Sequence, residues 1–203
     1  MPEIAALILA AGTASRFRAA SGEQGPTTKL VALLDGKALV RHVAEAALAS
    51  PVRPLVVVTG HARSAVEAAL ADLPVRFVHN PDFATGMASS LRAGLAALPG
   101  SADGALVLLG DMPRITPGVI EKLVAALAAS PGAKAVVPVL GGRSGNPALI
   151  TRALFSEVAG LKGDAGARAL LASAGKDVIE VPVEDSSIVF DVDTPDVLAA
   201  PRN

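Results

Sequence analysis

Residues 4–17 have the sequence IAALILAAGTASRF, an apolar run followed by a loop of glycine, alanine and short polar side chains. A continuous apolar run of this kind is typical of a strand that is buried on both faces of a parallel sheet. Small residues directly after such a strand let consecutive backbone N–H groups approach phosphate oxygens. The stretch therefore predicts a buried first strand that leads into a phosphate loop. A plain strand-to-helix turn around Gly12 is the alternative interpretation.

The alternation of apolar runs and helical segments continues to the end of the chain. The other runs that we expect to be strands are 55–59, 75–79, 105–109, 133–139 and 178–183. Among the segments between them, Pro117 to Ala129 has apolar residues at helical spacing, and Thr116 before Pro117 is typical of a helix N-terminus. The pattern predicts an α/β fold with three layers, α/β/α, and a mostly parallel sheet. Because no polar linker divides residues 1–203, we expect a single domain.

Composition and charge exclude several classes of function. The chain has 18 Lys+Arg and 19 Asp+Glu, a net charge of −1, and five Phe are its only aromatic residues. We therefore expect no nucleic acid and no membrane as a partner. Without cysteine there is no disulfide, thiolate metal site or cysteine nucleophile. The first apolar run is too short to span a bilayer and follows no basic segment, so we expect a cytoplasmic protein.

Two basic residues near the glycine loop suit the same phosphate groups. Arg16 can form a bidentate clamp on a phosphate, and Lys29, which follows a polar loop, can reach it as a point charge. The segment contains neither a Walker A pattern nor Gly-x-Gly-x-x-Gly, so it belongs to neither of those classes of phosphate loop.

Aspartates follow two of the later segments. Asp111 stands just beyond the end of a predicted buried strand, at the edge where ligands of open α/β sheets bind, and its carboxylate suits Mg²⁺. Capping of the following turn is the alternative role. Asp191 and Asp193 would lie on one side of a strand because they are two residues apart. Alternatively, one of them caps a helix that begins at Thr194 or the next residue.

Taken in order, these segments resemble a known enzyme family. The matching motifs are Leu9-Ala-Ala-Gly12, Ser15-Arg-Phe17, Pro26-Thr-Thr-Lys-Leu30, Asn80-Pro-Asp-Phe-Ala-Thr-Gly-Met-Ala-Ser-Ser-Leu91, Leu108-Leu-Gly-Asp-Met-Pro113, Gly145-Asn-Pro147, Gly163-Asp-Ala-Gly-Ala-Arg168 and Phe190-Asp-Val-Asp-Thr-Pro-Asp196. Together they are similar to the molybdenum cofactor cytidylyltransferases, members of the MobA-like NTP transferases with a Rossmann-like nucleotidyltransferase fold. The resemblance extends from about Ile4 to Leu198. The chain departs from the family at Ala14, where Gly or Ser is usual, and at Arg18, where Gly is usual.

The resemblance implies roles for the matching residues. It implies that Arg16, Lys29 and Asp111 are catalytic and that Asp111 and Asp193 hold Mg²⁺. The implied nucleotide-binding residues are Leu9, Ala10, Ala11, Gly12, Ser15, Arg16, Lys29, Asn80, Gly86 and Ser90. The implied acceptor-binding residues are Asn146 and Arg168. Two alternatives stay open, namely a helix-capping role for Thr85 in the 80–91 segment and a solvated helix position for Arg168.

The implied reaction is transfer of CMP from CTP to the terminal phosphate of molybdopterin with release of pyrophosphate. The implied protein partner is a molybdoenzyme or its chaperone. Leu-Ala-Ala-Gly rather than Leu-Ala-Gly-Gly favours CTP over GTP, because Ala11 would crowd a purine. Other interpretations stay open: an NAD(P)H-dependent oxidoreductase of the same family, a transferase that uses GTP or a sugar or alcohol phosphate acceptor, and a non-catalytic module that holds cofactor.

Overall fold

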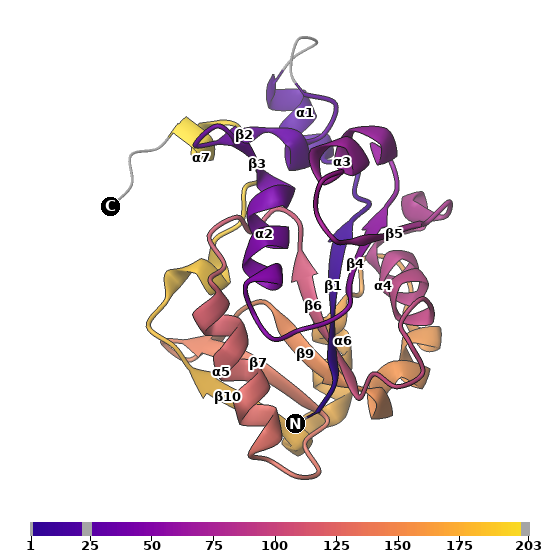
Figure 1. Cartoon of the computed structure of the whole chain (residues 1–203), viewed down its shortest axis with the longest axis vertical. Coiled ribbons are helices and arrows are strands. Elements are labelled where there is room, and N and C mark those ends of the chain that lie inside the picture. Colours follow the sequence, from indigo (N-terminus) through magenta and orange to yellow (C-terminus); the bar gives the residue numbers. More distant parts are fainter. Residues whose placement is uncertain (1, 22–25, 200–203) are drawn as a thin grey trace.

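The structure of the protein is a computed structural model that describes residues 2–21 and 26–199, apart from the side chains of Arg16, Arg18, Ser21 and Ala199. A central sheet lies between two layers of helices (Figure 1). Its strands are β1 (Ile4–Ala10), β4 (Leu55–Thr59), β5 (Arg76–His79), β6 (Gly104–Leu109), β7 (Ala135–Leu140), β8 (Arg143–Ser144), β9 (Ala148–Thr151) and β10 (Val178–Pro182). A separate two-stranded sheet contains β2 (Leu33–Leu34) and β3 (Lys37–Ala38).

The strand order is β10-β7-β9-β6-β1-β4-β5, with β8 paired to β7. β9 is antiparallel to both of its neighbours, and the other pairs along this order are parallel. The predicted α/β fold with a mostly parallel sheet is confirmed. Arg143 and Ser144 pair with the end of β7 as a short antiparallel strand, a pairing that the sequence did not predict.

The α-helices are α1 (Ser15–Ser21), α2 (Leu39–Leu48), α3 (Arg63–Ala69), α4 (Met87–Ala96), α5 (Pro117–Ala128), α6 (Ala167–Ala174) and α7 (Asp196–Ala199). The 3-10 helices are η1 (Lys29–Val31), η2 (Phe83–Thr85), η3 (Arg152–Gly160), η4 (Gly175–Asp177) and η5 (Ser186–Val189). The predicted cap of α5 is confirmed, since the Thr116 side chain accepts a hydrogen bond from the Val119 N–H. No helix in the described part of the chain is long and apolar enough to cross a membrane.

The two faces of the sheet carry separate apolar cores. Ile4, Ala6 and Ile8 of β1 pack into a core with residues of α2, α3 and α5, whereas Leu7 packs into the opposite core with α4, η3 and α6. Because both faces are covered, β1 needs no polar residue, which explains its continuous apolar sequence.

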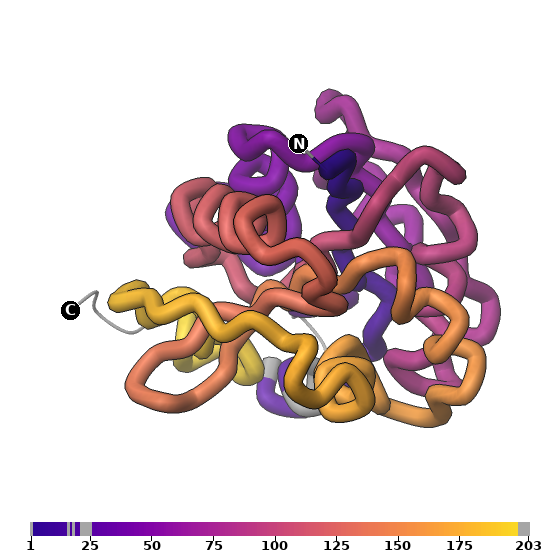
Figure 2. Tube along the Cα trace, turned by 90° about the horizontal axis from the view of Figure 1, so that it is seen from below, coloured from indigo at the N-terminus to yellow at the C-terminus, as the bar shows by residue number. Residues whose placement is uncertain are grey.

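A third, smaller cluster joins segments that are far apart in the sequence. It consists of Phe17 of α1, Ala32, Leu39 and Val192, with apolar residues of α7 packed against it. Figures 1 and 2 show this arrangement, in which the yellow C-terminal segment lies beside the indigo and purple N-terminal elements. The cluster brings the 190–195 segment to the edge of the sheet where β1 and β6 end.

Candidate active site

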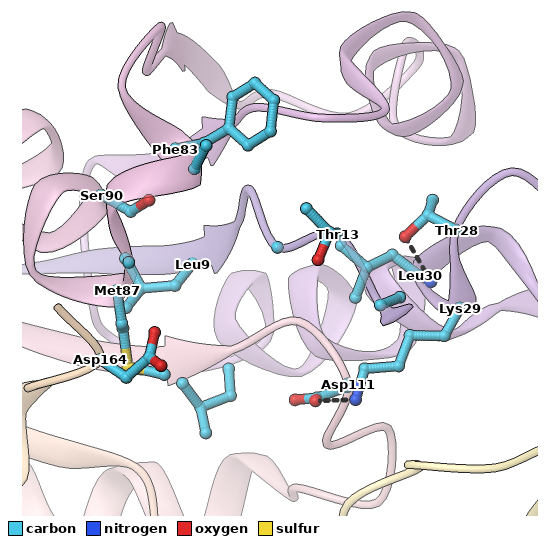
Figure 3. A pocket seen from close by; sticks show the side chains of 15 residues that line it. Leu9, Thr13, Thr28, Lys29, Leu30, Phe83, Met87, Ser90, Asp111 and Asp164 are labelled. Carbon is cyan, nitrogen blue, oxygen red and sulfur yellow. Dashed lines mark hydrogen bonds and ion pairs between the residues drawn. The ribbon is translucent and has the colours of Figure 1, made fainter. Parts of the chain in front are cut away.

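A pocket of about 400 Å³, here called the nucleotide pocket, opens where β1 and β6 end (Figure 3). Its lining residues are Leu9, Gly12, Thr13, Ala14, Thr28, Lys29, Leu30, Phe83, Ala84, Gly86, Met87, Ser90, Leu109, Asp111 and Asp164. In Figure 3, Lys29 and Asp111 lie at one end of the pocket, and Ser90 and Met87 lie at the other. The pocket therefore has the Lys29–Asp111 ion pair at one end, and apolar and hydroxyl groups together with the Asp164 carboxylate at the other.

The glycine loop forms one wall of this pocket, between β1 and α1. Gly12 does not lie in the left-handed backbone region, and a Cβ built there would meet no atom within 4 Å. Neither backbone strain nor packing of the described residues requires glycine at this position, so the simple turn interpretation does not explain it. Ala14, in contrast, has a φ of +51°, a conformation that glycine adopts more readily.

Three aspartates converge beside Lys29. The side chains of Asp111, Asp191 and Asp193 each place a carboxylate oxygen within 4.8 Å of the others, and we call this group the carboxylate cluster. The Lys29 Nζ lies 2.6 Å from Asp111 Oδ2 and 2.9 Å from Asp193 Oδ1. Only 13% of the Lys29 side chain is exposed, against 19% for Asp111 and 43% for Asp193, so its ammonium is the partly buried counter-charge of these carboxylates.

The backbone holds the cluster together. The Val192 N–H donates to the Asp111 carbonyl oxygen at 3.1 Å, which joins the 191–193 segment to the end of β6. The Arg114 guanidinium lies over the Phe190 ring, 3.9 Å from its centroid, and braces the residue before Asp191. Asp191 and Asp193 are not part of a strand, so the prediction of strand alternation is wrong; they approach Asp111 in an irregular segment after η5.

The closeness of these charged groups shifts the pKa values of Lys29 and Asp191. Burial by itself lowers the pKa of Lys29, but the nearby carboxylates of Asp111 and Asp193 raise it by more, so that the pKa lies above its ordinary value. Burial raises the pKa of Asp191, and the negative charges of Asp193 and Asp111 raise it further. An excess of negative charge in a partly buried cluster favours a cation, and carboxylate oxygens are the ligands that hard divalent cations prefer.

A buried hydrogen-bond network supports the other end of the nucleotide pocket. Asn80, which is 2% exposed, donates from Nδ2 to Ser89 Oγ at 2.8 Å and to Ser90 Oγ at 3.0 Å. Its Oδ1 accepts from the Asp82 N–H at 3.0 Å. Asn80 therefore does not line the pocket itself but holds Ser90 in its wall.

The N-terminus of α4 differs from its sequence-based prediction. Thr85 does not cap the helix: its hydroxyl donates to the Asp82 carbonyl oxygen, and the N-cap position is Gly86. Gly86 has a φ of +107°, and a Cβ there would collide with the backbone of Gly163. This close approach, together with the hydrogen bond from the Ala88 N–H to the Gly163 carbonyl oxygen, brings the 163–166 loop to the pocket.

The predicted nucleotide-binding residues divide into several groups. Leu9, Gly12, Lys29, Gly86 and Ser90 line the pocket. Ala10 and Ala11 are buried outside the lining; the Ala11 Cβ lies 2.8 Å from the position that a Cβ on Gly60 would occupy. Ser15 is exposed at the start of α1 and is also outside the lining. The side chain of Arg16 lies outside the described residues.

Several residues of the site were not predicted from the sequence. The sequence predicts Asp111 and Asp193 as the cation ligands, without Asp191. In the structure Asp191 belongs to the same cluster. Thr13, Met87 and Asp164 line the nucleotide pocket. Each of these residues stands within one of the quoted motifs or next to one, so their motif position was the available signal.

A second pocket of about 180 Å³, here called the acceptor pocket, contains the predicted acceptor-binding residues. Its lining residues are Leu109, Met112, Arg143, Ser144, Gly145, Asn146, Arg168, Ile188, Val189 and Asp191. The Asn146 N–H donates to the Ile188 carbonyl oxygen at 2.8 Å, which holds this loop against η5. The acceptor pocket shares Leu109 with the nucleotide pocket and borders the carboxylate cluster through Asp191.

Comparison with known sequences points to one family. A family model described as the MobA-like NTP transferase domain matches residues 6–178. The Bifunctional protein GlmU from Halorhodospira halophila is 38% identical over 125 residues, which are 60% of this chain and 24% of that protein. The chain thus matches about a quarter of the length of that curated relative.

Solved structures share the whole fold. A nucleotidyl transferase from Methanothermobacter thermautotroptrophicus has a TM-score of 0.83 and 26% identity, covering 97% of this chain and 94% of that one. Rv0371c from Mycobacterium tuberculosis has a TM-score of 0.81 and 27% identity, and the match covers 98% of this chain and 96% of that one. The structure of Rv0371c in complex with manganese has a TM-score of 0.73 and 26% identity, and the match covers 89% of this chain and 88% of that one.

Proposed function

The chain belongs to the MobA-like NTP transferase family, and from this premise we propose that it transfers CMP from CTP to the terminal phosphate of molybdopterin, releasing pyrophosphate. The observation that carries the proposal is the carboxylate cluster between two pockets. Asp111 lines the nucleotide pocket, and Asp191 lines the acceptor pocket. A group-transfer enzyme needs this arrangement, because donor and acceptor must meet where the charge on the reacting phosphate is neutralised.

The glycine loop supports a phosphate-binding role. Space beside Gly12 is open although neither its φ nor its packing requires glycine, so a ligand that approaches the backbone accounts for the missing side chain. Lys29 lines the same pocket as Gly12 and would stabilise the departing pyrophosphate, together with Arg16.

The carboxylate cluster suits a divalent cation, since it offers three oxygen donors within 4.8 Å of one another. We assign Mg²⁺ to Asp111 and Asp193, with Asp191 beside them; the manganese complex of Rv0371c supports a divalent ion in a related protein. When bound, such an ion supplies positive charge to the phosphate oxygens of the nucleotide. Lys29 now pairs with Asp111 and Asp193, so it shares these carboxylates with the cation.

No general base is needed for the reaction. The terminal phosphate of the acceptor is a phosphate monoester, which is already ionised near neutral pH because its second pKa is about 6. The protein therefore has to position the two phosphates and offset their charge rather than remove a proton. Among the residues that the structure describes, no histidine lines either pocket, in agreement with this requirement.

The choice of CTP rests on the resemblance of Leu9-Ala-Ala-Gly12 to the cytidylyltransferases. Ala11 packs toward Gly60 and does not line the pocket, so it would influence the base through the position of the loop backbone rather than by contact. Ser90, which Asn80 holds in the pocket wall, would contact the base or ribose at the end of the pocket opposite Lys29.

Calorimetric titration with CTP, GTP, ATP, UTP and NADPH, each with Mg²⁺, tests the nucleotide. We expect CTP to bind selectively and this binding to be lost in Asp111→Ala, and we expect the wild-type protein to release pyrophosphate when molybdopterin is added. Binding of NADPH alone, with oxidation of the nicotinamide in the absence of any nucleoside triphosphate, would overturn the transferase proposal in favour of a reductase.

A further inference from the structure

Arg143 lies where two hollows of the surface meet, although none of the matching motifs includes it. Arg143, Ser144 and Arg168 line both the acceptor pocket and an adjoining groove of about 540 Å³. The remaining groove residues are Val137, Leu171, Ala172, Gly175, Val178 and Glu180. The acceptor pocket therefore continues, past two arginines, from the carboxylate cluster into a larger and more apolar groove.

The two guanidiniums are free to bind an anion. Arg143 comes from β8 and Arg168 from α6; both are exposed, and neither pairs with a carboxylate of the described residues. Other arginines on the surface are engaged: Arg41 binds Asp72, and Arg63 binds Glu67. Two unpaired arginines from different elements, facing one small pocket, are an arrangement that suits a phosphate dianion.

The reaction itself requires positive charge at this position. The carboxylate cluster and the triphosphate of the donor both repel an anionic acceptor that must come close to them. Arg143 and Arg168 lie on the acceptor side of Asp191 and would offset this repulsion. The apolar side chains of Val137, Leu171 and Val178 suit the uncharged part of the same molecule.

We propose that Arg143 joins Arg168 in binding the phosphate of a phosphomonoester acceptor in the acceptor pocket, and that the body of the acceptor lies in the adjoining groove. The inference rests on the proposed nucleotidyl transfer and adds Arg143 and the adjoining groove to its acceptor site. In the transfer step an oxygen of the acceptor phosphate bonds to the α-phosphorus of the nucleoside triphosphate. The bond from that phosphorus to the bridging oxygen breaks, and its electron pair leaves with pyrophosphate, so nothing is oxidised or reduced.

Kinetics of Arg143→Gln test the assignment, with Arg76→Gln as the control because Arg76 is an exposed arginine on β5, at the other end of the sheet. We expect the KM for molybdopterin to rise at least tenfold in Arg143→Gln, while the KM for CTP and kcat stay within about twofold. Arg76→Gln should match the wild-type protein. An unchanged KM for molybdopterin in Arg143→Gln would overturn the inference.

Titration with inorganic phosphate separates this inference from the proposed function. The probe is added to protein saturated with CTP and Mg²⁺, and binding is followed by calorimetry. Weaker phosphate binding in Arg143→Gln than in Arg76→Gln supports the phosphate site even where molybdopterin itself proves not to be a substrate. Equal phosphate binding in the two variants contradicts the site, even where the wild-type protein transfers CMP to molybdopterin.

Discussion

In the nucleotide pocket, Lys29, Asp111 and Ser90 are held by partners within the protein, whereas the arginines of the acceptor pocket are exposed and unpaired among the described residues. Lys29 lies between Asp111 and Asp193, and Asn80 holds Ser90 in place. Groups that are already oriented need little reorganisation when a ligand binds, while long exposed side chains lose conformational freedom. Under the proposed function, the fold would set recognition of the donor and a few surface residues would set recognition of the acceptor.

The largest effect is expected at the carboxylate cluster, which both pockets border. Asp111→Ala removes a cation ligand and a partner of Lys29, so pyrophosphate release should fall at least about 10³-fold, as for other losses of preorganised charge. Thermal unfolding should show that the protein stays folded. Asp72→Ala, which removes only an exposed carboxylate paired with Arg41, should keep its activity. Full activity of Asp111→Ala would contradict the assigned role.

Replacing Lys29 tests whether its ammonium competes with a divalent cation for the carboxylates of Asp111 and Asp193. In Lys29→Met, CTP affinity should fall roughly 10- to 100-fold through loss of a charge-assisted contact. The affinity for Mn²⁺ alone should rise, because Asp111 and Asp193 lose the ammonium that now pairs with them. Electron paramagnetic resonance of free Mn²⁺ measures this second effect.

Lys37→Met is the matched control for that experiment, since Lys37 pairs with Glu45 away from either pocket. It should leave Mn²⁺ and CTP binding unchanged. If Lys29→Met bound Mn²⁺ no more tightly than Lys37→Met, competition between the ammonium and the cation would be excluded.

Asn80→Ala should affect stability as well as binding, since Asn80 is a buried part of the fold. Removing its amide leaves Ser89, Ser90 and the Asp82 N–H without these hydrogen bonds, at a cost of about 1–3 kcal/mol in the free energy of unfolding. Urea denaturation measures this loss, and CTP titration should show weaker binding. A variant as stable as the wild-type protein would show that the hydrogen bonds of Asn80 contribute little to the rigidity of this end of the nucleotide pocket.

The smallest effect is expected at Asp185, which anchors η5 beside the acceptor pocket. Burial raises the pKa of this carboxyl, but hydrogen bonds from Ser187 and Thr116 lower it by more, so that the pKa lies below its ordinary value of 3.8. Asp185→Asn should cost about 0.5–1 kcal/mol of unfolding free energy at neutral pH, because hydrogen bonds to a charged acceptor contribute more than those to a neutral one.

The pH dependence of that difference has a defined sign. Because the pKa of Asp185 is lower in the folded state, its stabilising contribution is present above 3.8 and is lost as the pH falls through the lowered value. Urea denaturation of the wild-type protein and Asp185→Asn should therefore show two stabilities that converge as the pH falls below 3.8. A difference that stays constant in acid would show that the charge of Asp185 is not involved.

Local patterns of the sequence were sufficient for most of the fold. The apolar runs predicted β1, β4 and β6, and Thr116 before Pro117 predicted the start of α5, since strand burial and helix capping depend on neighbouring residues. β9 was not predicted. It is short, and its place between β6 and β7 depends on pairing with strands that are distant in the sequence.

At the site, local sequence specifies which chemical groups follow the strands: a glycine loop after β1 and a carboxylate after β6. The distant groups that join them are specified by the tertiary structure alone. Asp191 reaches Asp111 because the Val192 N–H bonds to the Asp111 carbonyl oxygen, and Arg143 meets Arg168 because β8 folds back on β7. These contacts depend on hydrogen bonds and packing between segments that are far apart in the chain, and a local sequence pattern does not predict them.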